Sequence, residues 1–516
     1  IVTGASDTPV QIIIRDDEVT IAPADDLWGL DAYDAQDAVR AAVDPSVRTL
    51  TIGPAGERLS RIATIHTATS SAAGQGGFGA VMGAKRLKAI SVLGSGDVVI
   101  AEEDAFNTLV RQVGAEVRTY RPLPDTRRMT ERLRQTCPDG RVRPYACTAA
   151  CPTPCNLYYS NVRGVAMPDR VWEGHWACVG SLFRGMGEPG GVYDWGLGDA
   201  AGLEMNVLSN RYGLNQWEII IGLVPWLERC GWAGLISELN GTPIDWSSPT
   251  FWAEFLHALA YREGLGDVLA EGGVRAAETL GMGQEFLPHS YTAWGYAGHW
   301  DGHGSMANRL VFPFWIVSAL QWMTDTRDPY SSSHGYVQNV MRWGPLGGPR
   351  QPQNQGQAIT WDQMRGISQK VYGTPASLDP LSGYEGKAFP AYYHDVRSVL
   401  KDSLPTDDQV FPLIYSVTSE DRFCRIGDID GPSVDYHLFR LGTGVEWEEA
   451  EFERAAARIY TLERALTVRH WGRDRAMDET ALPPFEREEN WENPELGRKH
   501  ALDREAFGPV ADAYYR

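Results

Sequence analysis

The chain carries the sequence Ile52-Gly53-Pro54-Ala55-Gly56-Glu57 and, shortly after it, Ala73-Gly74-Gln75-Gly76-Gly77-Phe78-Gly79-Ala80-Val81-Met82-Gly83. A loop this rich in glycine lets the backbone come close to a bound group, and phosphate is a common one. No Gly-Lys-Ser/Thr follows, which excludes a P-loop, and the G-x-G-x-x-G register of a dinucleotide site is missing. The two phrases therefore indicate close backbone approach to a bound group of another kind.

The segments around these phrases have the pattern of a mixed α/β region. Apolar alternation predicts strands at 9–14, 18–21, 48–53 and 89–94. One helix is expected near 33–43, with Asp31 or Asp34 as its N-cap. Helical spacing dominates from about residue 100 onward, at 103–117, 198–213, 215–230, 250–260, 266–280 and 448–468. The pattern predicts the α+β class, in which a mixed α/β part precedes two mostly helical parts.

The composition describes an ordinary globular protein. Of its 516 residues, 43% are apolar and 22% charged, which excludes a disordered chain and a small disulfide scaffold. The net charge of −20 argues against general binding to nucleic acid or to an anionic membrane. No apolar run reaches the roughly 18 residues typical of a transmembrane helix, and no secretory signal is recognisable. With the clustered thiols, this favours the cytoplasm. The polar tail, 471–516, is expected to wrap around the surface.

The cysteines are unevenly distributed. Seven occur, and Cys147, Cys151 and Cys155 fall close together. Three thiolates at this spacing can reach three corners of one iron–sulfur cluster, and a distant cysteine then completes the set. Zinc is the alternative, but no histidine stands at ligand spacing nearby, so an iron–sulfur site is favoured. Of the others, Cys230 is expected in the core and Cys137 in an exposed loop.

The order of these motifs resembles the aldehyde:ferredoxin oxidoreductase family of tungsten, sometimes molybdenum, enzymes. The glycine phrases and the cysteine cluster are followed by Asp402-Ser403-Leu404 and by the closing segment Arg458-Ile459-Tyr460-Thr461-Leu462-Glu463-Arg464-Ala465. In that family the glycine segment helps to cradle a metal that two pyranopterin dithiolenes hold. The resemblance therefore implies that Gly74, Gly76, Gly77 and Gly79 line the cofactor.

The resemblance also implies cofactor contacts in two later segments. Asn210-Arg211-Tyr212-Gly213-Leu214-Asn215 stands where the family has a pterin phrase with carboxylates, and the amide of Asn215 is expected to hydrogen-bond a pterin ring. Asp402 begins the other pterin phrase. The family's fourth cluster cysteine normally ends that phrase, but Asp407 occupies its place here. Cys424 is therefore expected to be the fourth ligand, with Asp407 as the alternative.

Candidate active-site residues lie in two segments. In Trp172-Glu173-Gly174-His175-Trp176-Ala177-Cys178, Glu173 and His175 are suited to exchange the proton that accompanies two-electron chemistry, although a solvated glutamate and a structural histidine are the alternative. Cys178 resembles in position the metal-ligating cysteine of the tungsten subunit of class II benzoyl-CoA reductases, with a small core residue as the alternative. In the second segment, His299 and His303 are expected to line a pocket, and a surface turn is the alternative.

The resemblance divides the chain into three parts. Residues 1–98 are expected to be the remainder of a pterin-binding domain whose upstream part is absent, 99–284 a helical domain with the cysteine cluster, and 285–516 a helical and irregular domain with the substrate channel and the second pterin segment. The implied function is oxidation of an aldehyde to a carboxylic acid at a tungsto- or molybdo-bispterin centre. Electrons would leave through a [4Fe-4S] cluster to ferredoxin or an electron-transfer subunit.

Two other functions remain open at this point. The first is reduction of an aromatic acyl-CoA at the same cofactors, for which the Gly/Pro/aromatic-rich segment 285–395 would accept the ring. The second is an inactive, cluster-bearing relay or structural subunit. The sequence also leaves open the substrate, the choice between tungsten and molybdenum, and assembly into a homo-oligomer.

Overall fold

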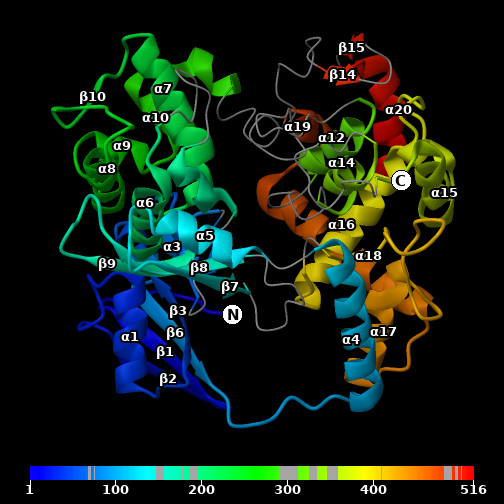
Figure 1. The fold of residues 1–516 in the computed structure, drawn as a ribbon, viewed down its shortest axis with the longest axis horizontal. Coiled ribbons are helices and arrows are strands. Elements are labelled where there is room, and N and C mark those ends of the chain that lie inside the picture. The colour runs from blue at the N-terminus through cyan, green and yellow to red at the C-terminus, as the bar shows by residue number, and fades with distance from the viewer. Residues whose placement is uncertain are drawn as a thin grey trace. The chain divides into compact units, whose positions relative to one another are not determined.

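The computed structural model describes the greater part of the chain. The described residues are 1–67, 71–74, 76–121, 124–146, 156–176, 178–185, 195–289, 312–324, 334–345, 358–407, 410–480, 491–493, 498–500 and 502–516. The chain divides into two compact units, unit 1 with Ile1–Asp97 and Leu123–Tyr291, and unit 2 with Val98–Pro122 and Thr292–Arg516 (Figure 1). The division into three parts made from the sequence stays a prediction.

Unit 1 begins with a six-stranded sheet, drawn in blue in Figure 1. Its strands are β1 (Val10–Arg15), β2 (Glu18–Pro23), β3 (Arg48–Ile52), β4 (Ile65–His66), β5 (Ala72–Ala73) and β6 (Leu87–Leu93). Their order is β2-β1-β6-β3-β4-β5; β1 and β6 pair parallel, and the other pairs are antiparallel. The four predicted strands are confirmed, whereas β4 and β5 are too short to leave a periodic signal.

Helix α1 (Ala32–Ala42) covers one face of this sheet and confirms the predicted helix. Asp31 is its N-cap, because its carboxylate accepts from the backbone N–H groups of Tyr33 and Asp34, both at 2.9 Å. On the buried side, the Gln36 amide donates to Thr51 Oγ1 of β3 at 3.1 Å. The hydrogen bonds therefore fix the start of α1 and its packing on β3 together.

A second, three-stranded sheet carries the segment that the sequence singled out for catalysis. Its strands β7 (Arg141–Tyr145), β8 (Asn156–Arg163) and β9 (Val171–Trp176) pair antiparallel in the order β7-β8-β9. Helix α6 (Gly198–Tyr212) packs against β9 so closely that a Cβ on Gly174 would lie 2.8 Å from Val207 Cγ2. The other face of β9 is therefore the one available to a site.

The remaining elements of unit 1 are mostly helical. They are α2 (Pro54–Glu57), α3 (Phe78–Ala84), α5 (Thr126–Leu133), the 3-10 helix η1 (Cys178–Arg184), the π-helix η2 (Glu218–Leu223), α7 (Val224–Trp232), α8 (Pro249–Tyr261), α9 (Leu265–Leu269), α10 (Gly273–Leu280), the 3-10 helix η3 (Gln284–His289) and the hairpin of β10 (Glu238–Leu239) and β11 (Thr242–Pro243). The predicted helix 266–280 is divided into α9 and α10, because Gly272 adopts φ +86°, outside the right-handed helical region.

Unit 2 is built from helices around one apolar core. Its helices are α4 (Glu103–Tyr120), α12 (Trp315–Thr324), the π-helix η4 (His334–Gln338), α14 (Asn339–Trp343), α15 (Trp361–Tyr372), the 3-10 helix η6 (Pro375–Leu378), α16 (Ala388–Ser403), the 3-10 helix η7 (Gly431–Ser433), α17 (Val434–Thr443), α18 (Glu449–Trp471), α19 (Arg475–Glu479) and α20 (Arg504–Tyr515). Unit 2 also contains two hairpins, β12 (Arg425–Ile426) with β13 (Ile429–Asp430) and β14 (Trp491–Asn493) with β15 (Arg498–His500). With the sheets of unit 1, this confirms the α+β class. No helix in the described part of the chain is long and apolar enough to cross a bilayer.

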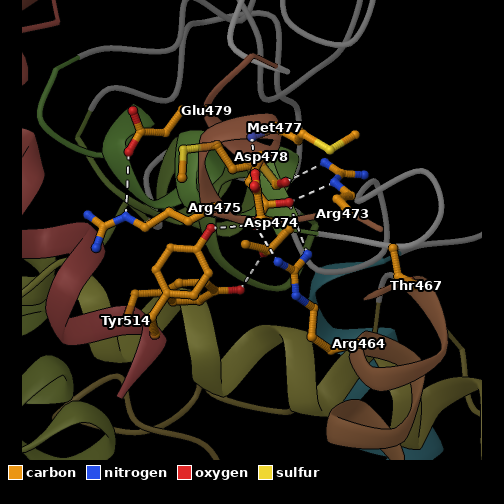
Figure 2. Close-up of polar contacts among 12 residues, drawn as sticks. Arg464, Thr467, Arg473, Asp474, Arg475, Met477, Asp478, Glu479 and Tyr514 are labelled. Atoms are coloured by element: carbon orange, nitrogen blue, oxygen red, sulfur yellow. Dashed lines mark hydrogen bonds and ion pairs between the residues drawn. The ribbon is translucent and has the colours of Figure 1, made fainter. Parts of the chain in front are cut away.

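The C-terminal tail differs from the prediction. Helix α20 is part of the core of unit 2, because Phe507, Ala511 and Tyr514 share one buried face at helical spacing. Its end is also held by Asp478 of α19, which is fully buried (Figure 2). The Asp478 carboxylate accepts from the Tyr515 hydroxyl at 2.6 Å and from two arginines, Arg464 and Arg473.

Candidate functional site

The glycine phrases of unit 1 fold into a cradle whose tightness comes from backbone contacts. A Cβ on Gly83 would lie 1.9 Å from the Gly56 carbonyl oxygen, and one on Gly79 would lie 2.5 Å from the Thr64 carbonyl oxygen. Gly77 adopts φ +67°, and a Cβ there would lie 2.5 Å from the Arg61 carbonyl oxygen. Folding alone therefore requires glycine at Gly77 and Gly79, two of the predicted cofactor contacts.

Gly74 lies in more open surroundings. The nearest atom to a Cβ placed on it is Asn215 Oδ1, at 3.9 Å. Asn215 is held in place by its backbone N–H, which donates to the Ile62 carbonyl at 2.9 Å, and its Oδ1 accepts from the Trp217 N–H at 3.0 Å. The structure thus brings together Gly74 and Asn215, which are far apart in the sequence. Gly76 adopts φ +82°, and a Cβ on it would lie 3.0 Å from the Phe78 ring.

Strand β4 brings a histidine that the sequence analysis missed. His66 pairs with Thr51 on β3 and with Ala72 on β5, directly before Gly74. It is completely buried, and neither ring nitrogen has a hydrogen-bond partner among the described residues. Thr64, on the same side of the chain two residues earlier, has a buried Oγ1 that is likewise unpaired. Burial first, and the nearby His175 second, lower the pKa of His66 to about 3.

A second histidine, His175 of β9, lies near enough to His66 to lower the pKa of its imidazole. Its ring stacks on Tyr145 with the centroids 5.6 Å apart and the planes at 28°. Its Nδ1 is buried without a partner among the described residues, and burial lowers the pKa of the imidazole to about 4. Both histidines are therefore neutral near pH 7. Each then offers one hydrogen-bond donor and one acceptor.

Glu173 stands two residues earlier on the same face of β9, but its side chain is exposed. It accepts a hydrogen bond from Tyr158 of β8; the pKa of this tyrosine is raised by burial first and by Glu173 second. Arg143 of β7 lies over the Tyr158 ring at 4.2 Å. The two residues of the predicted pair thus differ in their surroundings, since the Nδ1 of His175 is buried whereas Glu173 is exposed to solvent.

Several predicted residues lie outside the described ranges: Cys147, Cys151, Cys155, His299 and His303. The strands that flank the cysteine segment are described, and Tyr145 pairs with Asn156 while Leu157 pairs with Trp176. The ends of the segment 146–155 therefore lie at the same end of the sheet as His175. Cys178 begins η1 just after β9, although its side chain lies outside the description. Among the described residues, no group of three or more His, Cys, Asp or Glu is arranged to hold a metal.

Two of the predicted site residues of unit 2, Asp402 and Cys424, lie in the described part of the chain. Asp402 lies in the last turn of α16. Cys424 is completely buried in the core, its N–H donates to the Ile414 carbonyl at 2.9 Å, and burial raises the pKa of its thiol to about 12. Asp407, the alternative cluster ligand, lies 3.8 Å from Arg121. The choice between Cys424 and Asp407 stays a prediction.

The structure tests two further cysteines. Cys230 is fully buried, as predicted. The prediction of an exposed Cys137 is wrong, since only 5% of this residue is exposed. The turn after α5 folds back, so that the Cys137 N–H donates to the Leu133 carbonyl at 2.9 Å and the Gly140 N–H donates to the Cys137 carbonyl at 2.9 Å. This turn encloses the thiol.

Comparison with known proteins assigns both parts of the chain to one family. Residues 1–94 match the model "Aldehyde ferredoxin oxidoreductase, N-terminal domain", and residues 124–306 and 348–516 match "Aldehyde ferredoxin oxidoreductase, domains 2 & 3". The tungsten-containing aldehyde ferredoxin oxidoreductase of Pyrococcus abyssi is 28% identical over 351 residues, which cover 59% of this chain and 55% of the relative. An aliphatic sulfonate oxidoreductase, WOR-like subunit, of Pyrococcus furiosus is 25% identical over 327 residues, 54% of this chain and 50% of the relative. The chain spans about half the length of the curated relatives it matches.

One solved structure shares the fold over almost the whole chain. It is the active site complex BamBC of benzoyl coenzyme A reductase in complex with 1,5-dienoyl-CoA. The TM-score is 0.68 at 20% identity, and the match covers 99% of this chain and 77% of the other. At this identity the match establishes the fold. The family models carry the assignment: this chain belongs to the aldehyde ferredoxin oxidoreductase family.

Proposed function

We propose that the chain is part of an oxidoreductase that holds tungsten or molybdenum through two pyranopterins and oxidises an aldehyde to a carboxylic acid. The observation that carries the proposal is the cradle at Gly74 and Asn215, with buried polar atoms of Thr64, His66 and His175 in the same unit that have no partner among the described residues. Buried polar atoms without partners are rare in folded proteins, and a bound polar group is one explanation.

The residues present fit a pterin. A pterin is flat and has nitrogen and oxygen atoms along its edge, so it requires close backbone approach and side chains that both donate and accept. Gly74 would supply the first, and the Asn215 amide, whose Oδ1 already accepts from the Trp217 and Glu218 N–H groups, would contribute as a donor. Asp402 would hold the second pterin. When bound, the metal–pterin group supplies two-electron chemistry, and an iron–sulfur cluster supplies one-electron transfer.

Thiolates are the ligands that iron–sulfur clusters require. We assign Cys147, Cys151 and Cys155 to a [4Fe-4S] cluster, with Cys424 as the fourth ligand and Asp407 as the alternative. Support comes from the pairing of Tyr145 with Asn156, which brings the ends of the cysteine segment together in a hairpin. Electrons would pass from the cluster to ferredoxin or to an electron-transfer subunit.

Proton transfer falls to this chain's own residues. Conversion of an aldehyde and water to a carboxylic acid releases two electrons and two protons. His175, which a pKa of about 4 keeps neutral, would pass a proton on without becoming charged, since an imidazole can take up a proton at one nitrogen as it releases one from the other. Glu173 is exposed, and its hydrogen bond with Tyr158 holds it where protons can exchange with solvent. His299 and His303 would line the substrate pocket.

A second function, reduction of an aromatic acyl-CoA, is favoured by the position of Cys178. This residue begins η1 at the end of the sheet where the cysteine segment starts and ends. A thiolate there would suit a soft metal centre as an additional ligand. The chemistry would then run in the opposite direction, with electrons and protons added to the ring.

The test is metal analysis of the full-length protein, purified anaerobically with any subunit that accompanies it. About four iron atoms and one tungsten or molybdenum per chain are expected. Aldehyde oxidation with a dye acceptor would then support the first function, and ring reduction of an aryl-CoA the second. Iron without tungsten or molybdenum would contradict both and favour an electron-relay subunit. Zinc without iron would contradict the cluster assignment itself.

A further inference from the structure

His66 is the least explained polar side chain of unit 1. It is 0% exposed, and both of its ring nitrogens are buried without a hydrogen-bond partner in the described part of the chain. A leucine at this position would fill similar space with no polar atom to desolvate. An unpaired buried polar group costs about 1–3 kcal/mol, so folding alone gives no reason for a histidine here. The described part of the chain provides no hydrogen-bond partner for this residue.

We propose that His66 and His175 form an imidazole pair that hydrogen-bonds the uncharged polar edge of the pterin held by the glycine cradle. This inference rests on the proposed function and deepens it, because it names binding residues that the family motifs do not include. The cofactor edge would accept from one ring N–H and donate to one ring nitrogen, which pairs two of the three ring nitrogen atoms that have no partner among the described residues.

Aromatic side chains contact both imidazole rings. The Tyr33 ring of α1 meets His66 edge-on at a centroid distance of 6.0 Å, and Tyr145 stacks on His175 at 5.6 Å. The backbone carbonyl of His175 accepts from the Asn206 amide of α6 at 2.9 Å, which fixes β9 at this point. Aromatic contacts on one side of each ring leave the nitrogen atoms for a ligand.

The surroundings favour a neutral ligand edge over an anion or a metal ion. No carboxylate bonds to either imidazole among the described residues: Asp31 and Asp34 pair with Arg211, and Glu173 bonds to Tyr158. Without an acidic partner both rings stay uncharged, and a neutral imidazole is both a donor and an acceptor. A metal would need further ligands, and the described residues offer no third one.

The position of His66 also matches the cradle. It pairs with Ala72 in β5, and this strand leads directly into Gly74. The carbonyl of Thr64, two residues before His66, lies against Gly79. A group seated at Gly74 and Asn215 therefore lies beside the strand that carries the imidazole.

The experiment compares the wild-type protein with His66→Leu, His66→Gln and His470→Leu, each purified anaerobically as the full-length protein. Pterin per chain is measured by fluorescence after oxidative release, and metals by elemental analysis, before and after prolonged dialysis. His66→Leu should retain about tenfold less pterin after dialysis, which corresponds to about 1.4 kcal/mol. His66→Gln, which keeps one donor and one acceptor, should retain most of it. His470 is exposed on α18, and its replacement should change nothing.

Stability of the cofactor-free chain gives an independent readout. His66→Leu should unfold at the same or a higher urea concentration than wild type, because it removes unpaired polar atoms. His394→Leu is the matched contrast: this histidine is equally buried, but its Nε2 is 2.8 Å from the Tyr372 hydroxyl, so its loss should destabilise the chain. A structural role for His66 would instead make both variants less stable.

Four other outcomes would each overturn the inference, and the measurements tell them apart. If wild type contains pterin and His66→Leu retains it equally, the imidazole pair does not bind it. If His66→Leu destabilises the cofactor-free chain as His394→Leu does, His66 is structural. If wild type holds zinc that His66→Leu loses, the pair is a metal site. If wild type contains no pterin at all, the proposed function fails and the inference fails with it.

Discussion

Arg211, in the last turn of α6, donates from Nη1 to the Asp31 carboxylate at 2.7 Å, and Asp31 is at the same time the N-cap of α1. The same Nη1 lies 2.9 Å from Asp34, and the guanidinium lies over the Tyr33 ring at 5.5 Å. One cation thus ties α6, which precedes Asn215, to the helix that covers the six-stranded sheet. Burial lowers the pKa of Arg211, but the two carboxylates outweigh it, and the pKa is raised overall.

We expect Arg211→Leu to lower the free energy of unfolding by about 2 kcal/mol, since Arg211 and Asp31 are both largely buried and Asp31 would lose its charged donor. Urea denaturation of the cofactor-free chain measures this. Arg127→Leu is the control, because Arg127 pairs with Glu131 on an exposed surface of α5. That change should cost less than about 0.5 kcal/mol. Equal effects of the two substitutions would contradict the structural role given to Arg211.

Glu204 of α6 fixes the connection between β8 and β9. Its fully buried carboxylate accepts from the backbone N–H groups of Val165, Ala166 and Met167 at 2.7–2.9 Å, and from Trp172 Nε1 at 3.0 Å. Glu204→Leu takes the acceptor from four donors, of which Trp172 Nε1 is buried and the three backbone N–H groups are partly buried, and we expect a loss of about 3 kcal/mol. Glu204→Gln keeps one acceptor oxygen and should lose less. Hydrogen exchange at residues 165–167 should accelerate in both variants. Slow exchange in Glu204→Leu would contradict the role given to the Glu204 carboxylate.

The cradle glycines should divide into two classes. Gly83→Ala places a Cβ 1.9 Å from a backbone oxygen, so it should prevent α2 and α3 from packing and yield unfolded protein. Gly74→Ala meets nothing closer than 3.9 Å and should fold normally. If Gly74 contacts the pterin as proposed, Gly74→Ala should nevertheless retain less of it. Normal pterin content in this variant would remove Gly74 from the set of binding residues.

Stability should fall in mild acid because of His66. Its folded pKa of about 3 lies below its ordinary value of 6.5, so between these values the unfolded chain binds the proton more strongly. The free energy of unfolding is therefore highest above pH 6.5, where His66 is neutral in both states, and it falls progressively between pH 6.5 and pH 3. At pH 5 this residue alone should cost about 2 kcal/mol relative to pH 7.5.

The measurement is urea unfolding of the cofactor-free chain at both pH values. His66→Leu should lose about 2 kcal/mol less than wild type on acidification, since it lacks the group that titrates. His470→Leu should behave as wild type does. A wild-type chain and a His66→Leu chain with the same pH dependence would mean that His66 is accessible to protons in the folded state.

Asp478 should be essential for holding the C-terminal helix. Figure 2 shows Arg464 and Arg473 pointing at this carboxylate, and Arg473 also donates to the Met323 carbonyl of α12 at 2.6 Å. We expect Asp478→Ala to cost about 3 kcal/mol, because two guanidinium groups and the Tyr515 hydroxyl lose their acceptor. Limited proteolysis should then cleave before α20. Asp512→Asn, at an exposed ion pair with Arg475, should leave the protease pattern unchanged.

Local pattern was sufficient for much of the fold. The strands at 9–14 and 48–53 and the helix capped by Asp31 follow from apolar periodicity and a short polar side chain, both of which are properties of neighbouring residues. The glycine phrases could also be recognised from neighbouring residues, and the structure explains them, because a Cβ at Gly77, Gly79 or Gly83 would lie 1.9–2.5 Å from a backbone oxygen. The family followed from the order of such motifs.

Other features depend on contacts between distant segments. Cys137 is surrounded by polar, turn-forming residues, yet a turn closed by its own backbone buries it. The tail looked like a surface segment, but the spacing of Phe507 and Tyr514 directs α20 into the core. In both cases burial is set by what packs on the segment from elsewhere.

The sequence by itself determined the α+β class, the main helices and strands, and the family, because these depend on residue types at short spacing. Only the tertiary structure decided that Asn215 lies against Gly74 and that His175 meets His66. Strand β4 is two residues long, so it has no apolar periodicity to detect. His175 in β9 is more than a hundred residues away from it in the chain. The His66 ring and the Nδ1 of His175 are buried where segments far apart in the sequence come together, and neither has a hydrogen-bond partner among the described residues.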